Sequence, residues 1–255
     1  MLAEDPSGAS IPAAYDPAAC EIRSSVERGR LLAVCGLCGG AGASTLAYLV
    51  ALAAARTHPG SVLVADTGGP TGGLSSYAGV EVSRSLAELS AQSAAGPRTA
   101  LEVETSSDGV QVLAAGPRFT AECAAEGIKL LLDQARERYA LTVIDCGTLA
   151  SEVGQTVMDE ATHIAWVLPA TEHGVELGQR VLAAAPSGRG SQLLVARRDR
   201  RQTKAPVREL RRLAGEHRLP LVLVPDLCGL EDGNLPRAVD AAQVSVQAIL
   251  GALRR

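Results

Sequence analysis

The sequence predicts a single doubly wound α/β domain, in which helices cover both faces of a mostly parallel sheet. Short apolar segments of strand length alternate along the chain with longer segments of helical period, as in repeated β-α-β units. The strand segments are continuously apolar, which is typical of strands that are buried on both faces. A length of 255 residues and a hydrophobic fraction of 47% suit one such domain and exclude wholesale disorder.

The strands are expected at short aliphatic runs, most of which are followed by glycine, proline or aspartate. Residues 1–29 precede the first run, are rich in Ala, Pro, Ser and Gly, and lack periodicity. They predict a flexible arm, so that the folded domain spans residues 30–255. In chain order, the expected strands are Leu31–Cys35, Ser61–Asp66, Gly109–Ala115, Leu141–Asp145, Thr162–Leu168, Gln192–Ala196 and Leu221–Val224.

The helices are expected where apolar residues recur at a period near 3.6. The segment Ser44–Arg56 is apolar on almost every side, which indicates a helix buried in the core. The last helix has one apolar face, and core packing explains it better than a membrane anchor. The segment Gly69–Gly79 is rich in Gly, Pro and Ser and is predicted to be loop. The expected helices are Ser44–Arg56, Ser83–Ala91 with Ser83 as its cap, Thr120–Arg138, Gly174–Ala185, Pro206–His217 and Leu235–Leu253.

Composition narrows the classes of function. Aromatic residues make up only 2% of the chain, too few for a base-stacking platform that binds single-stranded nucleic acid. A net charge of −4 argues against global attraction to phosphate backbones. No apolar run approaches the roughly 20 residues of a transmembrane helix. Glu4 and Asp5, with no apolar stretch around them, argue against a signal peptide, so a cytoplasmic location is expected.

A glycine-rich turn joins the first strand to the first helix and reads GLCGGAGAST from Gly36 to Thr45. Glycines let the backbone curl around an anion, and the following helix points its positive end at the same place. Ser44 stands where a P-loop carries the hydroxyl that ligates magnesium. The residues expected to contact nucleotide are Gly39, Gly40, Ala41, Gly42, Ala43, Ser44 and Thr45.

Two further strands end in a carboxylate, Asp66 and Asp145. Ligands of open α/β sheets bind beyond the carboxyl ends of the strands, which is where these side chains are expected. Carboxylate and hydroxyl oxygens are the ligands that magnesium prefers. Ser44, Asp66 and Asp145 therefore form the candidate magnesium site beside a phosphate-binding loop.

The loop departs from the standard P-loop pattern, because Ala43 occupies the position of the lysine and Leu37 that of the first glycine. The chain contains only two lysines, Lys129 and Lys204, and neither is near in sequence. A lost charge-assisted hydrogen bond costs about 1.5–3 kcal/mol, so nucleotide binding is expected to outlast hydrolysis. The alternative is a glycine turn that binds nothing.

The loop string from Gly39 to Ala47, GGAGASTLA, resembles the deviant P-loop of ParA/MinD-type ATPases, and most of all the CpaE/TadZ branch. The strand ending in Asp66 is similar to the one before switch I, and Leu141–Asp145 to the one before switch II. Gly109–Ala115 and Met158–Pro169 are similar to two more segments of the family's sequences, so that the resemblance covers roughly residues 30–250. It implies a P-loop NTPase-like fold, with ATP and Mg2+ as cofactors.

Two positions depart from the family pattern. Cys38 stands in place of its signature lysine, and Gly68 in place of the second switch I carboxylate. Together with Ala43, the chain thus lacks three side chains that would assist hydrolysis. The resemblance thus implies a degenerate positioning or assembly factor that binds ATP weakly with little or no hydrolysis. The alternatives are an active nucleotide-switch ATPase for DNA or cargo partitioning, and a nucleotide-free scaffold.

The resemblance also implies a homodimer and a protein partner in a bacterial secretion, pilus or division apparatus. Composition is rich in Ala and Arg, which suggests a high-GC genome and relatives among actinobacterial septum-site proteins. The partner would recruit the protein to the pole, the septum or the inner membrane face. The dimer is expected to form across the P-loop side, with Cys38 and Ala43 removing charges that would otherwise repel.

Two other groups of residues allow more than one interpretation. A basic run from Arg197 to Arg212 suits a solvated face, a protein partner or anionic surface, or non-specific DNA binding. Cys35 and Cys38, with Cys146, could hold zinc or form a redox pair, but buried structural thiols fit better because Cys35 lies on an expected core strand. His163, His173 and His217 lack partners at metal-ligand spacing and are expected at the surface or at strand ends.

Overall fold

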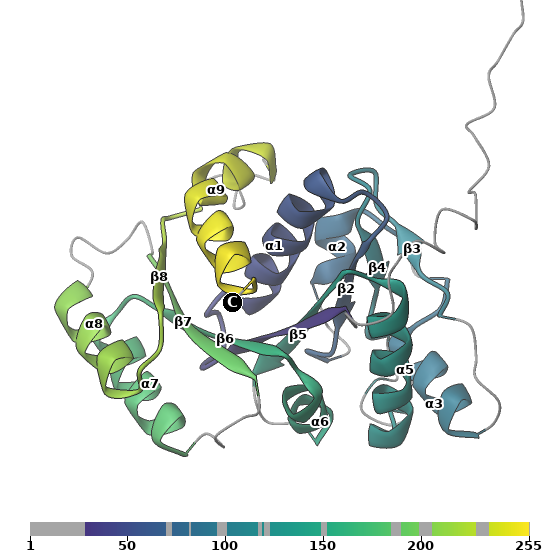
Figure 1. The fold of residues 1–255 in the computed structure, drawn as a ribbon, viewed down its shortest axis with the longest axis horizontal. Helices are drawn as coiled ribbons and strands as arrows, with labels where there is room; N and C mark the ends of the chain where they lie inside the picture. The colour runs from purple at the N-terminus through teal and green to yellow at the C-terminus, as the bar shows by residue number, and fades with distance from the viewer. Residues whose placement is uncertain are drawn as a thin grey trace, which may run out of the picture.

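The computed structural model describes residues 29–69, 73–81, 83–95, 101–116, 119, 123–148, 152–184, 190–198, 206–227 and 235–254. Within them, eight strands form one sheet in the order β3-β4-β2-β5-β1-β6-β7-β8, with helices on both faces (Figure 1). All neighbouring strands are parallel except β3 and β4, which pair antiparallel at one edge. The predicted doubly wound, mostly parallel α/β fold is confirmed. The expected N-terminal arm lies outside the described residues, except for Gly29.

The strands are β1 (Arg30–Gly36), β2 (Val62–Asp66), β3 (Glu104–Thr105), β4 (Gln111–Leu113), β5 (Leu141–Thr148), β6 (His163–Pro169), β7 (Ser191–Arg197) and β8 (Leu221–Val224). The helices are α1 (Ala43–Thr57), α2 (Leu74–Ala78), α3 (Leu86–Ala95), α5 (Ala125–Arg138), α6 (Glu152–Glu160), α7 (Glu172–Ala184), α8 (Val207–Glu216) and α9 (Leu235–Ala252). Among the described residues, no helix is both long and apolar enough to cross a membrane.

Two hydrophobic cores lie on opposite faces of the sheet. Helices α1, α2 and α9 bury their apolar residues on one face, and α3, α5, α6, α7 and α8 do so on the other (Figure 1). Along β1, Leu31, Ala33 and Cys35 belong to one core, whereas Leu32 and Val34 belong to the other. Because successive side chains of a strand alternate in direction, burial on both faces requires a continuously apolar strand.

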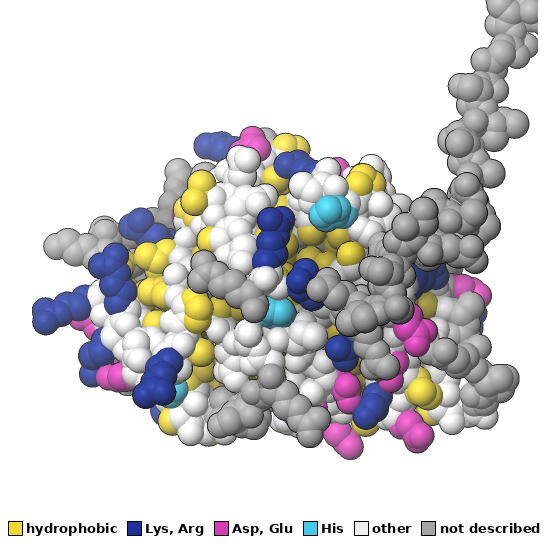
Figure 2. Space-filling view, viewed as in Figure 1, with side chains coloured by type: hydrophobic (Ala, Val, Ile, Leu, Met, Phe, Trp, Pro, Cys, Tyr) yellow, Lys and Arg dark blue, Asp and Glu magenta, His cyan; other side chains and the backbone are white. Residues whose placement is uncertain are grey.

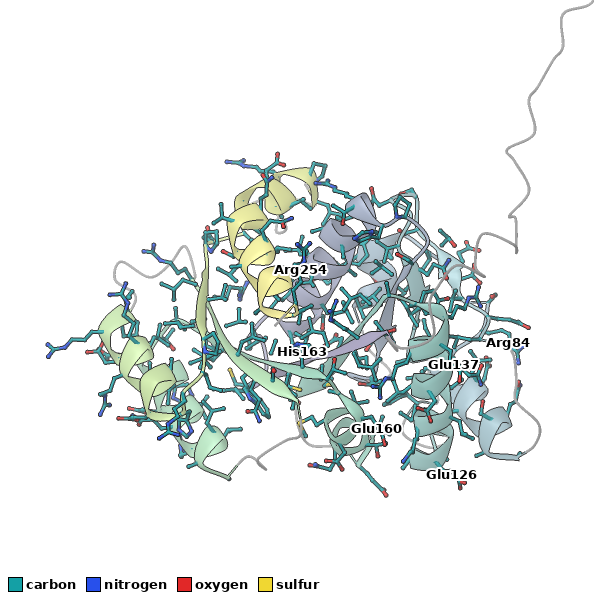
Figure 3. All side chains as sticks on the ribbon, in the orientation of Figure 1. Arg84, Glu126, Glu137, Glu160, His163 and Arg254 are labelled. Atoms are coloured by element: carbon teal, nitrogen blue, oxygen red, sulfur yellow. The ribbon has the colours of Figure 1, made fainter. Side chains whose placement is uncertain are left out.

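The helices that cover the sheet each have a buried face and an exposed face. Glu126 and Glu137 of α5, labelled in Figure 3, are exposed, while Ile128 and Leu131 of the same helix are buried. The last helix buries the predicted face as core packing, in agreement with the expectation from its sequence. The buried residues of that face are Val239, Ala242, Val246, Ile249 and Leu253.

Several local predictions were wrong. The segment predicted as loop contains α2, because Leu74 and Ala78 are buried and Gly79 ends the helix with a φ of 62°. The cap of α3 is Ser85 and not Ser83: the Glu88 N–H donates to Ser85 Oγ at 3.3 Å, and the Ser85 N–H to Glu88 Oε2 at 3.0 Å. This reciprocal pair is a capping box.

Two elements had no counterpart in the sequence prediction, the short edge strand β3 and helix α6. Helix α5 begins at Ala125, later than the predicted start. Residues 123 and 124 precede the helix, and residues 120–122 of the prediction lie outside the described residues. The remaining predicted strands and helices agree with the structure to within a few residues at each end.

The strand order decides where ligands could bind. Strands β2, β5 and β1 are neighbours in the middle of the sheet and run parallel, so their carboxyl ends lie together. The pairing register sets Val34 of β1 opposite Asp145, and Asp145 opposite Asp66. The glycine loop and both strand-end aspartates therefore meet at one edge of the sheet.

Candidate functional site

The glycine loop leads from β1 into α1 and leaves the start of that helix open. Gly42 is the residue before the helix, with a φ of 93°, and it makes no side-chain cap. The first turn of α1 carries no acidic residue either. The first N–H groups of a helix have no partner within it, so they remain available to an anion at this end.

The glycine loop is fixed where it begins and leaves open space beside its backbone. The Leu37 N–H donates to the Val167 carbonyl at 2.8 Å, which fixes the loop to β6 where it begins. Gly40 has a φ of 74°, a conformation that other residues rarely adopt. A Cβ atom added at Gly39 or Gly40 would meet no atom within 4 Å, so the backbone there borders open space.

The side chain of Thr45 is tied to helix α2. Its hydroxyl donates to the Tyr77 hydroxyl at 3.2 Å, and Tyr77 in turn stacks near Tyr48 of α1 with ring centroids 6.4 Å apart. Thr45 is buried. Its side chain therefore holds α2 against α1. Only its backbone N–H is left to contact an anion bound at the loop.

The two strand-end carboxylates lie side by side and are almost wholly buried. Asp66 is 1% exposed and Asp145 is 0% exposed. Each accepts one backbone hydrogen bond on its Oδ1 atom, from Gly68 at 2.9 Å and from Gly147 at 3.0 Å. Asp145 Oδ2 has no hydrogen-bond partner among the described residues.

Burial makes both carboxyl groups hold their protons more tightly. It raises the pKa of Asp66 to about 7, with a smaller contribution from the charge of Asp145, while N–H groups of Gly68 and Leu74 act in the opposite direction. Burial also raises the pKa of Asp145, and the Ser44 hydroxyl lowers it. Two buried like charges with an orphaned oxygen are the arrangement that a divalent cation would relieve.

The residues present fit a magnesium ion by the chemistry of their donors. Asp66 and Asp145 supply carboxylate oxygens, and Ser44 lies close enough to Asp145 to influence its pKa. Magnesium is usually bound by one or two carboxylates together with water and substrate phosphates. The fold brings together all three predicted metal-site residues.

The segment after β2 touches the last residues of β5 through the glycines Gly68 and Gly147. The Thr67 N–H and hydroxyl both donate to the Asp145 carbonyl, at 2.7 and 2.9 Å. A Cβ at Gly147 would lie 2.7 Å from Gly68 Cα, and a Cβ at Gly68 would lie 3.2 Å from Gly147 Cα. A side chain at Gly68, where the family pattern has a carboxylate, would thus have little room.

From the sequence, Arg197 was expected to belong to a basic run that continues to Arg212, but in the structure it lies against the glycine loop. It ends β7, and its Nη2 atom donates to the Gly40 carbonyl at 3.1 Å. A Cβ on Gly42 would lie 2.9 Å from Arg197 Nε, so the guanidinium group rests against the glycine loop. The position of Arg197 at the carboxyl end of a strand, like that of Asp66, was the signal that could have identified it.

The rest of the predicted basic run lies apart from the loop, as far as it is described. Arg208, Arg211 and Arg212 are exposed on α8, and dark blue side chains gather over that helix in Figure 2. Arg212 pairs with Glu216 at 3.5 Å. Residues 199–205, including Lys204, lie outside the described part of the chain. Arg197 therefore does not belong to the α8 surface.

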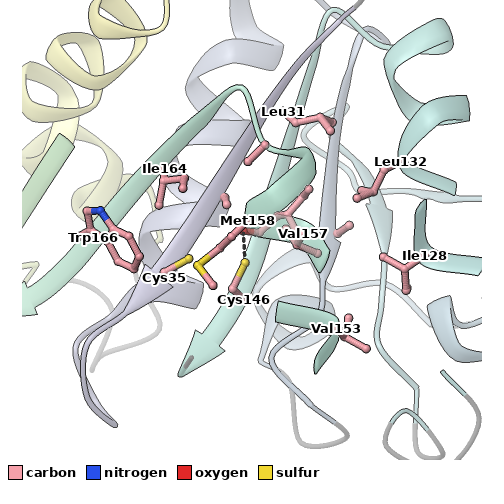
Figure 4. Packing of buried hydrophobic residues seen from close by; sticks show 14 of the residues in the cluster. Leu31, Cys35, Ile128, Leu132, Cys146, Val153, Val157, Met158, Ile164 and Trp166 are labelled. Atoms are coloured by element: carbon pink, nitrogen blue, oxygen red, sulfur yellow. Dashed lines mark hydrogen bonds between the residues drawn. The ribbon is translucent and has the colours of Figure 1, made fainter. Parts of the chain in front are cut away.

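Two of the three cysteines near the loop are buried as expected, whereas Cys38 is only half-buried. Cys35 and Cys146 are buried on the neighbouring strands β1 and β5, among Met158 and Trp166 (Figure 4). The adjacent Cys35 and burial together raise the pKa of the Cys146 thiol well above its ordinary value. The described residues contain no group of three or more His, Cys, Asp or Glu that could hold a metal. His163 lies at the start of β6, as predicted, and is labelled in Figure 3.

Neither a protein-family model nor a curated protein matches the sequence. Solved structures do match the fold. A ParA family ATPase from Chlorobium tepidum has a TM-score of 0.72 at 17% identity, over 89% of this chain and 98% of that one. The septum site-determining protein MinD from Pyrococcus horikoshii, solved with Mg-ADP, has a TM-score of 0.68 at 17% identity, over 88% and 93%.

A third match is a synthase. Cobyrinic acid a,c-diamide synthase from Mycobacterium smegmatis, solved with ADP and magnesium, has a TM-score of 0.65 at 18% identity, over 87% and 94% of the two chains. At these identities the likeness shows that the chain has the fold of ParA/MinD-type P-loop ATPases. It does not select one activity among them, because fold and function are separable.

Proposed function

We propose that this chain is a degenerate ParA/MinD-like protein that binds magnesium and ATP weakly and serves as a positioning or assembly factor. The observation that carries the proposal is the buried pair Asp66 and Asp145 beside the uncapped start of α1. A carboxylate pair at this depth has no structural advantage by itself, since burial raises both pKa values. It becomes favourable when a cation and an anion occupy the same edge of the sheet.

Different groups of the chain would bind the phosphates and the magnesium ion. The N–H groups from Gly39 to Thr45 would hold the phosphates, since the start of α1 is uncapped and Gly39 and Gly40 border open space. Ser44, Asp66 and Asp145 would hold the magnesium ion. The ion would neutralise phosphate charge, as expected from its usual chemistry with nucleotides. The solved structures of similar fold that contain Mg-ADP make this ligand plausible.

Hydrolysis is expected to be absent or very slow. Ala43 and Cys38 supply no cation, and Gly68 supplies no second carboxylate to assist water attack. Removing one electrostatic contributor of this kind typically costs about 100- to 1000-fold in rate. An adenine nucleotide would then act as a bound ligand and not as a consumed substrate.

A calorimetric titration with Mg-ATP, paired with a turnover assay, tests the proposal. We expect binding without turnover. Gly42→Val should abolish binding, because the new side chain meets Arg197 and intrudes on the loop. Gly60→Val is the matched control: Gly60 also has a positive φ, of 71°, but its Cβ would meet nothing within 4 Å. Rapid turnover would favour the active ATPase, and the absence of binding or heat protection by millimolar ATP would favour the empty scaffold.

We further propose that the protein forms a homodimer across its P-loop side and uses its outer helices to hold a protein partner. The small, uncharged Cys38 and Ala43 would let two such faces approach without nucleotide. The partner would then recruit the dimer from the cytoplasm to the pole, septum or inner membrane face. Light scattering at tens of micromolar should give a dimer mass with and without ATP. A strict monomer under both conditions would reject the dimer.

A further inference from the structure

The candidate site lacks a lysine in its loop, but it does not lack a cation. We propose that Arg197 supplies this positive charge and binds the phosphate groups of the nucleotide. This inference rests on the proposed nucleotide binding and assigns the charge to a residue that lies 157 positions from Gly40 in the sequence. Phosphate is the ligand that its chemistry suits, because a planar guanidinium can donate two parallel hydrogen bonds to phosphate oxygens.

The backbone of Arg197 is fixed on both sides, so its side chain has a defined direction. The Ala170 N–H donates to the Arg197 carbonyl at 2.7 Å, and the next N–H, of Arg198, donates to the Val224 carbonyl at 2.9 Å. Strand β7 pairs with β6 up to Arg197, and β6 pairs with β1. The strand order therefore brings Arg197 to the edge where the glycine loop begins.

The guanidinium group is only partly satisfied by the protein. One of its donors reaches the Gly40 carbonyl, while its Nε atom is buried without a hydrogen-bond partner among the described residues. Within that same part of the chain, no carboxylate lies within ion-pair distance of Arg197. A buried donor without an acceptor is unfavourable, and an anion bound at the loop would remove this defect.

The glycine at position 42 accommodates this arrangement. Arg197 Nε and Cδ would lie 2.9 and 3.0 Å from a Cβ at Gly42, so a side chain there would displace the arginine from the loop. Gly42 thus allows both the left-handed turn before α1 and the approach of the arginine. The lysine position next to it, Ala43, is buried and carries no charge. The arginine reaches the loop from a different strand, β7.

The test compares Mg-ATP affinities by calorimetry for the full chain and three variants. Arg197→Gln should weaken binding by about 10- to 100-fold, the range expected for one charge-assisted hydrogen bond. Arg197→Lys should recover part of that loss. Arg198→Gln is the matched control, because Arg198 is the adjacent residue, is exposed, and loses the same charge. Its affinity should stay within about twofold of wild type.

The melting temperature of each unliganded variant separates ligand binding from support of the loop. We expect Arg197→Gln to melt at the wild-type temperature and to respond less to added salt in ATP binding. Equal ATP affinity of Arg197→Gln and wild type would overturn the inference and leave the proposed function intact. A weaker affinity with a matching loss of melting temperature would also overturn it. If wild type binds neither ATP nor inorganic tripolyphosphate, both proposals fail.

Discussion

Replacing Asp66 by Asn should stabilise the unliganded protein at pH 8, although it removes a magnesium ligand of the proposed site. Asp66 is almost fully buried beside Asp145, and burial raises its pKa from 3.8 to about 7. Asn keeps the oxygen that accepts the Gly68 N–H and removes the charge. The variant therefore loses a binding group and gains stability, because functional sites often contain residues that lower the stability of the protein.

Proton binding by Asp66 determines how the free energy of unfolding changes with pH. The pKa of Asp66 is higher in the folded chain than in the unfolded one, so the folded state binds more protons between about pH 4 and pH 7. The stability contributed by this group is complete below pH 4 and is lost as the pH rises through 7. Each pH unit is worth about 1.4 kcal/mol, which sets an upper limit of about 4 kcal/mol at pH 8. Residual burial in the unfolded chain reduces this to about 2–4 kcal/mol.

Urea denaturation of wild type and Asp66→Asn at pH 5 and pH 8, with EDTA present, measures the effect. The difference in free energy of unfolding should be about 2–4 kcal/mol at pH 8 and about 1 kcal/mol at pH 5. Asp240→Asn, on the exposed side of α9, should match wild type at both values. Added magnesium should stabilise wild type at pH 8 but not the variant. A variant that is equally stable or less stable at pH 8 would refute the reasoning.

Two other substitutions test separate parts of the structure. Gly127→Ala should lower the free energy of unfolding by about 2 kcal/mol or more in urea, because its Cβ would lie 2.0 Å from the Ser90 carbonyl oxygen of α3. Gly215→Ala, whose Cβ meets nothing within 4 Å, should be neutral or stabilise by up to about 1 kcal/mol. Ala43→Lys should tighten ATP binding about 10- to 100-fold in calorimetry, and an unchanged affinity would mean that the missing lysine does not limit binding.

The sequence by itself determined the α/β class, most of the elements and the position of the glycine loop. These features depend on local signals: a continuous apolar run marks a doubly buried strand, and glycines at a strand-to-helix turn mark an anion cradle. Local signals also located both strand-end aspartates. They failed for α2, because Leu74 and Ala78 become helical through burial against the rest of the fold, which outweighs a loop-like composition.

Only the tertiary structure decided which distant residues meet. The strand order sets Asp66 beside Asp145, and their shared burial raises both pKa values. It also brings Arg197 onto the glycine loop, although in sequence this arginine starts a basic run that continues into α8. The physical reason is that a parallel sheet aligns strand ends from remote parts of the chain at one edge. No local pattern records which strands become neighbours, so the strand-end position of Arg197 could mark it as a candidate, but only the folded molecule shows that it meets the glycine loop.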